Sequence, residues 1–141
     1  MELGDYAYRF KGYSVAEGIS ASLVGVGTMI LGTDNLITGH QRTAITRLSG
    51  QSSKLRIGYW SLDGHYSLVQ SGHGTHDYEA VIEFTQLNGS TDSDNQVLKG
   101  TFNFVPVSKK KVWLIATGGS LLSSNGKAVN EAVSGEAELI E

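Results

Sequence analysis

Two basic side chains, His40 and Arg42, lie two positions apart in the sequence Gly-His-Gln-Arg. Alternate residues of a β-strand point to the same face, so an extended segment presents both side chains together. Inside a cavity, such a pair can bind a carboxylate or stabilise a developing enolate oxygen. On the exterior, the same two residues are ordinary surface residues. The sequence leaves both placements open.

Glu131 is the acidic residue with the most chemical interest. Within the segment 129–140 it falls, by period-two counting, on the same face as the apolar Val133, and this face is predicted to point inward. A carboxylate in an apolar interior must be paired or have its pKa raised, and a carboxyl with a raised pKa can act as a general acid or base. Two alternatives are an exposed position at a rim, and a β-bulge at Gly135 that turns Glu136 inward.

Aromatic residues are concentrated on the strand faces that are predicted to point inward. The candidates for lining a ligand pocket are Tyr6, Tyr8, Phe10, Trp60, Phe102 and Phe104. The alternative interpretation is that these side chains are simply the hydrophobic core. Trp113 points opposite to Val112 and Leu114, so it is predicted to lie outside with Ile115, where both residues are available for a subunit contact.

Several histidine and acidic residues suggest a metal site, but their spacing argues against one. These residues are His65, His73, His76, Asp77 and Glu79. Because His73 and His76 are three positions apart, an extended chain sends them to opposite faces. The sequence has no cysteine and no zinc, nucleotide-loop or dinucleotide motif. We therefore predict neither a metal nor a cofactor.

Nine segments have the alternation or composition of β-strands, and none predicts a substantial helix. They are 6–13, 21–31, 36–48, 55–62, 65–70, 75–87, the two strands of a hairpin within Val97–Gly118, and 129–140. Asp63-Gly64 is predicted to be a two-residue hairpin turn.

Short connections between these strands favour an antiparallel meander, and long glycine-bent strands remove their free edges by closing into a barrel. A closed antiparallel meander needs an even number of strands. We therefore predict an all-β fold with a barrel of about eight strands, in which 55–62 is the most peripheral candidate. A β-sandwich is the alternative.

Composition excludes several classes of function. The 141 residues fit one domain, 1–141, and include 18 glycines but one proline. A net charge of -3 with interspersed signs offers no basic footprint for nucleic acid. No apolar run reaches the length of a membrane span, and the N-terminus, Met-Glu-Leu-Gly-Asp, lacks the features of a signal peptide. A cytoplasmic location is predicted.

Two glycine-containing stretches carry a family resemblance: Gly25-Val26-Gly27-Thr28 followed by Ile37-Thr38-Gly39, and Val133-Ser134-Gly135-Glu136-Ala137. With the meander, they resemble calycin-type barrels, and more closely the bacterial allene-oxide-cyclase-like barrels, many of them uncharacterised. Gly58-Tyr59-Trp60 has the form of the lipocalin motif but lies mid-chain, which argues against a true lipocalin. The resemblance implies the fold, and no catalytic residue of the plant cyclase is carried over.

The leading functional prediction is a small barrel that binds a small apolar or amphipathic molecule, fatty-acid-like or polyketide-like, in its lumen. One alternative is a cofactor-free isomerase or cyclase that uses the same cavity, with Glu131, His40 and Arg42 as catalytic residues. Another is a non-catalytic homo-oligomeric assembly protein that associates through the outer strand faces bearing Trp113 and Ile115.

Overall fold

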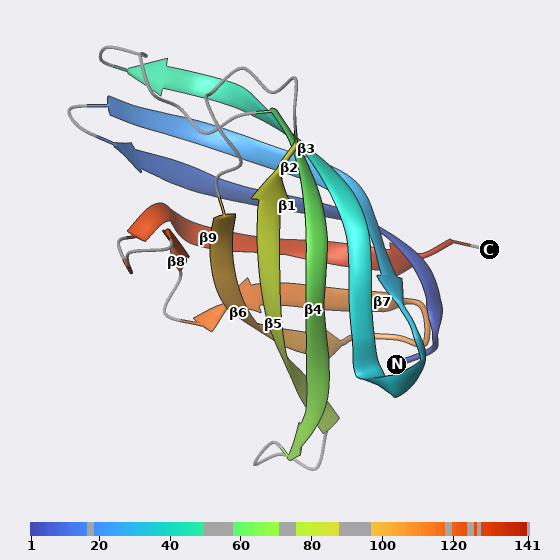
Figure 1. Ribbon diagram of the computed structural model, residues 1–141. Helices are drawn as coiled ribbons and strands as arrows, with labels where there is room; N and C mark the ends of the chain where they lie inside the picture. Colours follow the sequence, from blue (N-terminus) through green and yellow to red (C-terminus); the bar gives the residue numbers. More distant parts are fainter. Residues whose placement is uncertain are drawn as a thin grey trace.

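The computed structural model describes residues 1–16, 19–49, 58–70, 76–87, 97–117, 120–123, 126 and 128–140. These residues form β-strands and one short 3-10 turn, η1 (Thr33–Asn35), as Figure 1 shows. The strands are β1 (Gly4–Ala16), β2 (Ile19–Leu31), β3 (Leu36–Ser49), β4 (Gly58–Gln70), β5 (His76–Gln86), β6 (Val97–Pro106), β7 (Lys111–Ala116), β8 (Ser120–Ser123) and β9 (Ala128–Leu139). No helix in the described part of the chain is long and apolar enough to cross a membrane.

The strands form a closed antiparallel barrel, as the sequence predicts. Each strand from β1 to β6 pairs with the next one, β7 pairs with β9, and β9 pairs with β1. These eight strands complete the wall. The short β8 pairs with β6 and β9, the same two strands that flank β7, so β7 and β8 occupy successive parts of one gap.

The register of the pairs fixes the stagger of the barrel. Cross-strand partners followed once around the wall from Leu68 of β4 lead back to β4 at Gly58, which is a shear of 10 residues, from position 68 to position 58. Eight strands with this shear tilt about 40° from the barrel axis, and their interior is wide enough for side chains or one small ligand.

The predicted turn at Asp63-Gly64 is wrong, because both residues lie inside the continuous strand β4. Gly64 pairs with Ile37 on one side and Ile82 on the other. A Cβ atom placed on Gly64 would overlap the carbonyl oxygen of Val81. The glycine thus allows two strands to approach closely, and the described part of 55–62, which was the candidate expected to be peripheral, belongs to the barrel wall.

Burial also shows which face of β3 points into the lumen. Ile37 and Gly39 are buried, and Gln41 and Thr43 lie on the same inner face. The opposite face, which begins at Leu36, is exposed.

Candidate functional site

The middle of the lumen is filled by aromatic side chains. The six predicted pocket residues, Tyr6, Tyr8, Phe10, Trp60, Phe102 and Phe104, are all buried. Phe10 stacks on Phe102 with ring centroids 5.2 Å apart, and Phe84 meets both rings edge-on at 6.3 and 6.2 Å. Because β1 and β5 are four strands apart in either direction round the wall, these contacts cross the barrel. The inward placement of the aromatics is confirmed, and at this level they form a packed core.

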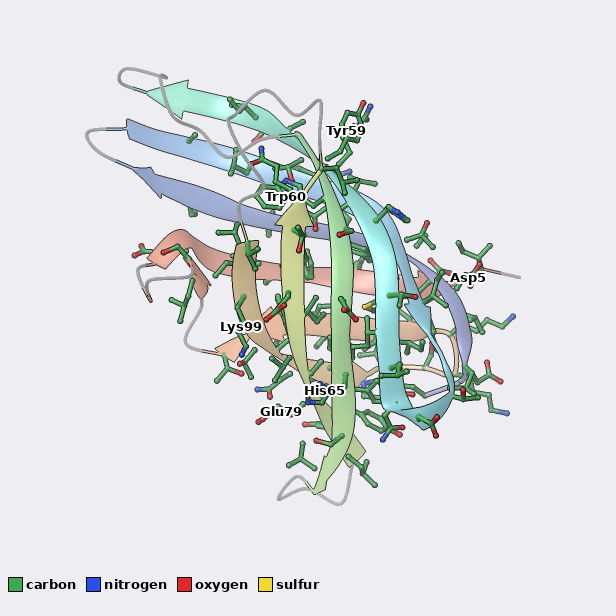
Figure 2. All side chains as sticks on the ribbon, in the orientation of Figure 1. Asp5, Tyr59, Trp60, His65, Glu79 and Lys99 are labelled. Atoms are coloured by element: carbon green, nitrogen blue, oxygen red, sulfur yellow. The ribbon has the colours of Figure 1, made fainter. Side chains whose placement is uncertain are left out.

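A polar layer lies on the inner wall beside this core. Tyr8, Gly27, Gln41, Trp60 and Gln86 are successive cross-strand partners on β1 to β5. They follow one another across the inner face of these five strands, and Figure 2 labels Trp60 near the start of β4, with its neighbour Tyr59. The layer therefore brings together two amides, a phenol and an indole that lie far apart in the sequence.

The hydrogen bonds of this layer leave one buried donor unused. The hydroxyl of Tyr8 donates to Oε1 of Gln41 over 2.8 Å, and Nε2 of Gln41 donates to Oγ1 of Thr43 over 2.8 Å. The indole nitrogen Nε1 of Trp60 is buried and has no acceptor among the described residues. A buried donor without a partner costs free energy, so this N–H is a place where a ligand acceptor or a water stabilises the protein.

A second apolar cluster lies beyond the polar layer. Ala21 and Leu23 are buried and pack with Ile45, separately from the main core. Along β3, Gln41 and Thr43 come between Ile37 of the main core and Ile45 of this cluster. The lumen thus changes from aromatic to polar and back to apolar toward the end formed by the hairpin of β1 and β2.

Burial raises the pKa of the Tyr8 phenol well above its ordinary value near 10. Above pH 10 the unfolded chain releases this proton and the folded chain retains it, so the free energy of unfolding falls by about 1.4 kcal/mol per pH unit from this group, with no contribution below pH 10. We expect Tyr8→Phe to show a shallower loss of stability in denaturant unfolding at pH 9, 10 and 11. The exposed Tyr13→Phe is the control. Equal slopes for wild type and Tyr8→Phe would contradict the prediction.

His40 and Arg42 point away from the lumen. Both side chains are exposed on the outer face of β3. They line a pocket of about 310 Å³ together with Val26, Tyr59 and Leu87, and Gln41 and Trp60 of the polar layer also belong to its lining. Of the two placements that the sequence left open, the exterior one is therefore correct.

The predicted inward orientation of Glu131 is wrong. Lys11 pairs with Ser134 whereas Tyr13 pairs with Glu131, so β9 holds one extra residue over this interval. Such a bulge reverses the alternation of side chains, and Glu131 is exposed beside the exposed Tyr13. Period-two counting could not include this extra residue.

The second alternative for β9 does not hold either, because Glu136 is exposed as well. The expectation of an isomerase or cyclase required Glu131, or the pair His40 and Arg42, to reach the cavity, and none of them does. No group of three or more metal-ligating side chains occurs among the described residues, and His73 lies outside them.

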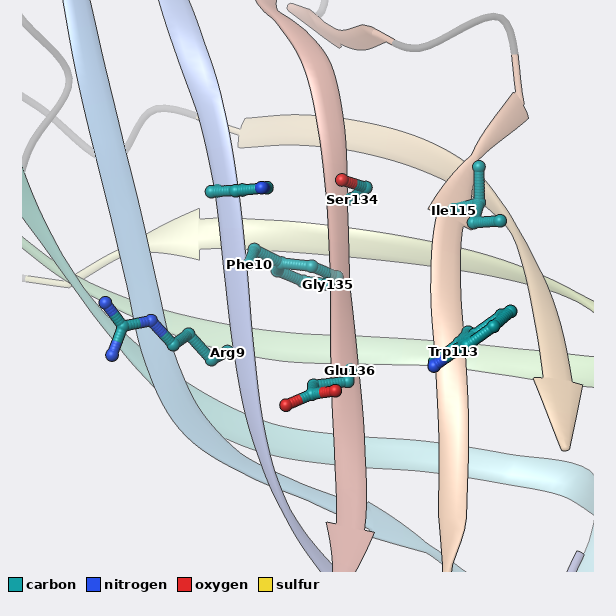
Figure 3. Close-up of a pocket in the computed structure, with 8 residues that line it drawn as sticks. Arg9, Phe10, Trp113, Ile115, Ser134, Gly135 and Glu136 are labelled. Atoms are coloured by element: carbon teal, nitrogen blue, oxygen red, sulfur yellow. The ribbon is translucent and has the colours of Figure 1, made fainter. Parts of the chain in front are cut away.

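The outer wall has a hollow that the sequence analysis did not identify. It measures about 400 Å³ and lies over β9, between Arg9 and Lys11 of β1 on one side and Trp113 and Ile115 of β7 on the other, as Figure 3 shows. The small Ser134 forms part of its floor. Trp113 and Ile115 are exposed, which confirms their predicted outward orientation.

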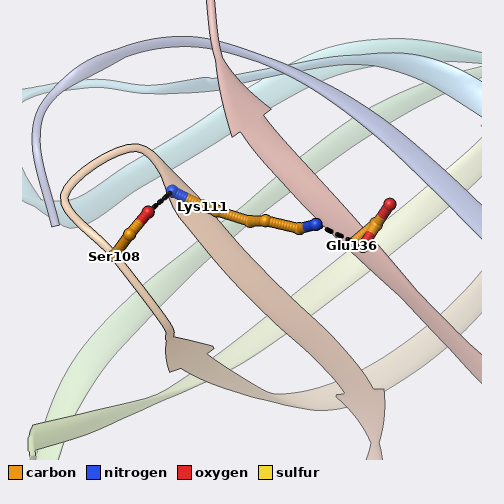
Figure 4. A network of polar contacts seen from close by, with 3 residues as sticks. All are labelled: Ser108, Lys111 and Glu136. Carbon is orange, nitrogen blue, oxygen red and sulfur yellow. Dashed lines mark hydrogen bonds and ion pairs between the residues drawn. The ribbon is translucent and has the colours of Figure 1, made fainter.

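One carboxylate in this hollow is held by a neighbouring strand. Nζ of Lys111 lies 3.1 Å from Oε2 of Glu136, as Figure 4 shows. The backbone N–H of Lys111 donates to Oγ of Ser108 over 3.1 Å, which anchors the start of β7 to the preceding turn. Both partners of the ion pair are about half exposed, so its contribution to stability is small.

The site therefore has two parts: a polar layer in the lumen with one unused donor, and a charged and aromatic hollow on the outer wall. The resemblance to calycin-type and allene-oxide-cyclase-like barrels stays a prediction from the sequence. Comparisons of the chain with protein-family models, with curated proteins and with solved structures find no match.

Proposed function

We propose that the protein binds a small, mainly apolar molecule that carries a neutral hydrogen-bond acceptor, such as a ketone or ester carbonyl, at the polar layer of the lumen. The observation that carries this proposal is the buried indole N–H of Trp60, which has no acceptor among the described residues. A ligand oxygen at this position removes the cost of the unpaired donor.

The ligand needs an acceptor for the buried N–H of Trp60, although the layer also contains an acceptor, the buried amide oxygen of Gln86. The N–H of Trp60 has no acceptor among the described residues, and Oε1 of Gln41 already receives the Tyr8 hydroxyl. The ligand is neutral because the nearest cations on β3, His40 and Arg42, lie outside. A carboxylate bound at this layer would be buried without a described counter-charge. This favours an ester or ketone over a free fatty acid.

The apolar body of the ligand has a matching surface next to the layer. Ala21, Leu23 and Ile45 form a small apolar cluster on the side away from the packed phenylalanines. Binding here moves the apolar chain of the ligand out of water, and each of its methylenes removed from water contributes about 0.8 kcal/mol. The proposed ligand therefore lies with its oxygen at Trp60 and its chain along β2 and β3.

Three compounds of equal length test the proposal: 2-nonanone, nonane and nonanoate. Trp113→Phe leaves Trp60 as the sole tryptophan, so its fluorescence reports events at the layer. We expect 2-nonanone to bind about tenfold more tightly than nonane, because one buried hydrogen bond is completed, and nonanoate to bind most weakly. Isothermal titration calorimetry gives the affinities independently.

Trp60→Phe is the closest variant, since it keeps a six-membered aromatic ring and removes the five-membered ring that carries the N–H. It should reduce the affinity for 2-nonanone to that for nonane and leave nonane unchanged. Equal affinities for all three compounds in the wild type, no binding of any of them, or an unchanged affinity for the ketone in Trp60→Phe would each refute the proposal.

A further inference from the structure

One row of exposed side chains runs across the outer wall from β7 to β4. Cross-strand pairing places its members in the order Trp113, Glu136, Arg9, Val26, Arg42 and Tyr59. Tryptophan, tyrosine and arginine are the residue types that contribute most to binding at protein interfaces. The row has the composition of an interaction surface.

The partner of this surface must satisfy both signs of charge. Arg9 and Glu136 are direct cross-strand neighbours, and Glu136 is followed by Trp113 on the next strand. A uniformly acidic partner would place like charge against Glu136, and a uniformly basic one would do so against Arg9. The complementary surface therefore carries the same two charges in the reverse order.

We propose that the part of this row from Trp113 to Val26 binds a second copy of the same chain, with a twofold axis parallel to the strands and between β9 and β1. Such an axis places β9 of one subunit over β1 of the other, and β7 over β2. Sheets that pack face to face keep their strands within about 30° of each other, so the rows of the two subunits stay in register near the axis.

The pairs produced by this axis are complementary. Glu136 faces Arg9 of the partner subunit, and by symmetry Arg9 faces Glu136 of the partner subunit. Trp113 faces Val26 of the partner subunit, and these two side chains are 49% and 46% exposed in the single chain. Each charged side chain therefore faces one of opposite charge, and each apolar side chain faces another apolar one.

The next row toward the hairpin of β1 and β2 agrees with the same axis. Its members, in order, are Ile115, Ser134, Lys11 and Val24. Ile115 then faces Val24 of the partner subunit. Lys11 of the partner subunit lies over the small Ser134, so the hollow of about 400 Å³ receives its long side chain. In the proposed dimer, the hollow is thus the position that a lysine side chain of the other subunit occupies.

Sedimentation equilibrium of the full chain over a range of concentrations tests this dimer. Lys111→Gln serves as the background, because Lys111 pairs with Glu136 and would repel an arginine placed there. In this background we expect Arg9→Glu to raise the dissociation constant of the dimer about a hundredfold, since two like-charge pairs are created. The double exchange Arg9→Glu with Glu136→Arg should return it to within about tenfold of the background.

Two residues farther along the same row provide matched controls. Arg42→Glu and Tyr59→Ala alter an arginine and an aromatic residue on β3 and β4. Because the convex wall curves away from the axis at these strands, both variants should leave the dimer intact. Trp113→Ala should weaken it about tenfold or more. A monomer at all concentrations, a charge exchange that fails to restore association, or an oligomer that responds to Arg42→Glu rather than to Arg9→Glu would overturn the proposal. Circular dichroism checks that each variant is folded.

Discussion

Phe102→Ala is expected to destabilise the barrel by about 3–5 kcal/mol, because it removes a fully buried ring from the packed centre of the lumen. The ring contacts Phe10 from the opposite wall and Phe84 from the adjacent strand. Neither neighbour can move inward without losing its own packing, so the truncation leaves a cavity. Urea unfolding curves measured at constant pH give the change in the free energy of unfolding.

Leu36→Ala is the matched control for this substitution. Leu36 is 52% exposed at the start of β3, so its truncation should cost less than about 1 kcal/mol. A cost for Phe102→Ala as small as that of the control would mean that the centre of the lumen is not packed. That result would also reopen the aromatic residues as a ligand pocket, in place of the polar layer.

The part of the fold that the sequence predicts well depends on local alternation. Tyr6, Tyr8 and Phe10 lie inward, and so do Phe102 and Phe104, because a regular strand sends every second side chain to the same face. Long strands bent at glycines and the need to remove free edges then lead to a closed barrel. None of these steps requires knowledge of distant contacts.

The failures occur where a distant strand decides the local geometry. Asp63-Gly64 has the composition of a tight turn, but Gly64 is required by the approach of β5. Glu131 was placed by counting, and the bulge opposite Lys11 and Tyr13 reversed it. Both errors follow from pairings that are fixed only when the barrel closes.

Tyr8 and Trp60 of the candidate site were among the predicted pocket residues, but the contact of Tyr8 with Gln41 was missed for the same reason. Tyr8 and Gln41 lie 33 residues apart, and Trp60 lies farther along the chain. The three residues meet only through the register of β1 to β4. The available signal was a glutamine that alternates with glycine and threonine on one face of an apolar strand. That signal became informative only once the face was known to point inward.

The glycines that carry the family resemblance have a physical role that the structure makes explicit. A Cβ atom on Gly27 would overlap the carbonyl oxygen of His40, and one on Gly39 would overlap that of Thr28. The neighbouring strands approach each other so closely at these points that there is no room for a side chain. The closure of any barrel with this register requires such residues, so they support the fold and leave the family open.

Gly135→Ala tests this requirement at the third such position and is expected to destabilise the barrel by about 3 kcal/mol. A Cβ atom on Gly135 would overlap the carbonyl oxygen of Arg9 and lie 2.9 Å from Cα of Phe10. These are backbone atoms of the strand that closes the barrel, so relief requires β1 and β9 to separate. Gly32→Ala is the control, because its Cβ would lie 3.8 Å from the carbonyl oxygen of Leu36 and its backbone is extended. Denaturant unfolding should show a large decrease in the free energy of unfolding for Gly135→Ala and a change within about 1 kcal/mol for Gly32→Ala. Equal stabilities of the two variants would show that β9 and β1 pack less closely than this register implies.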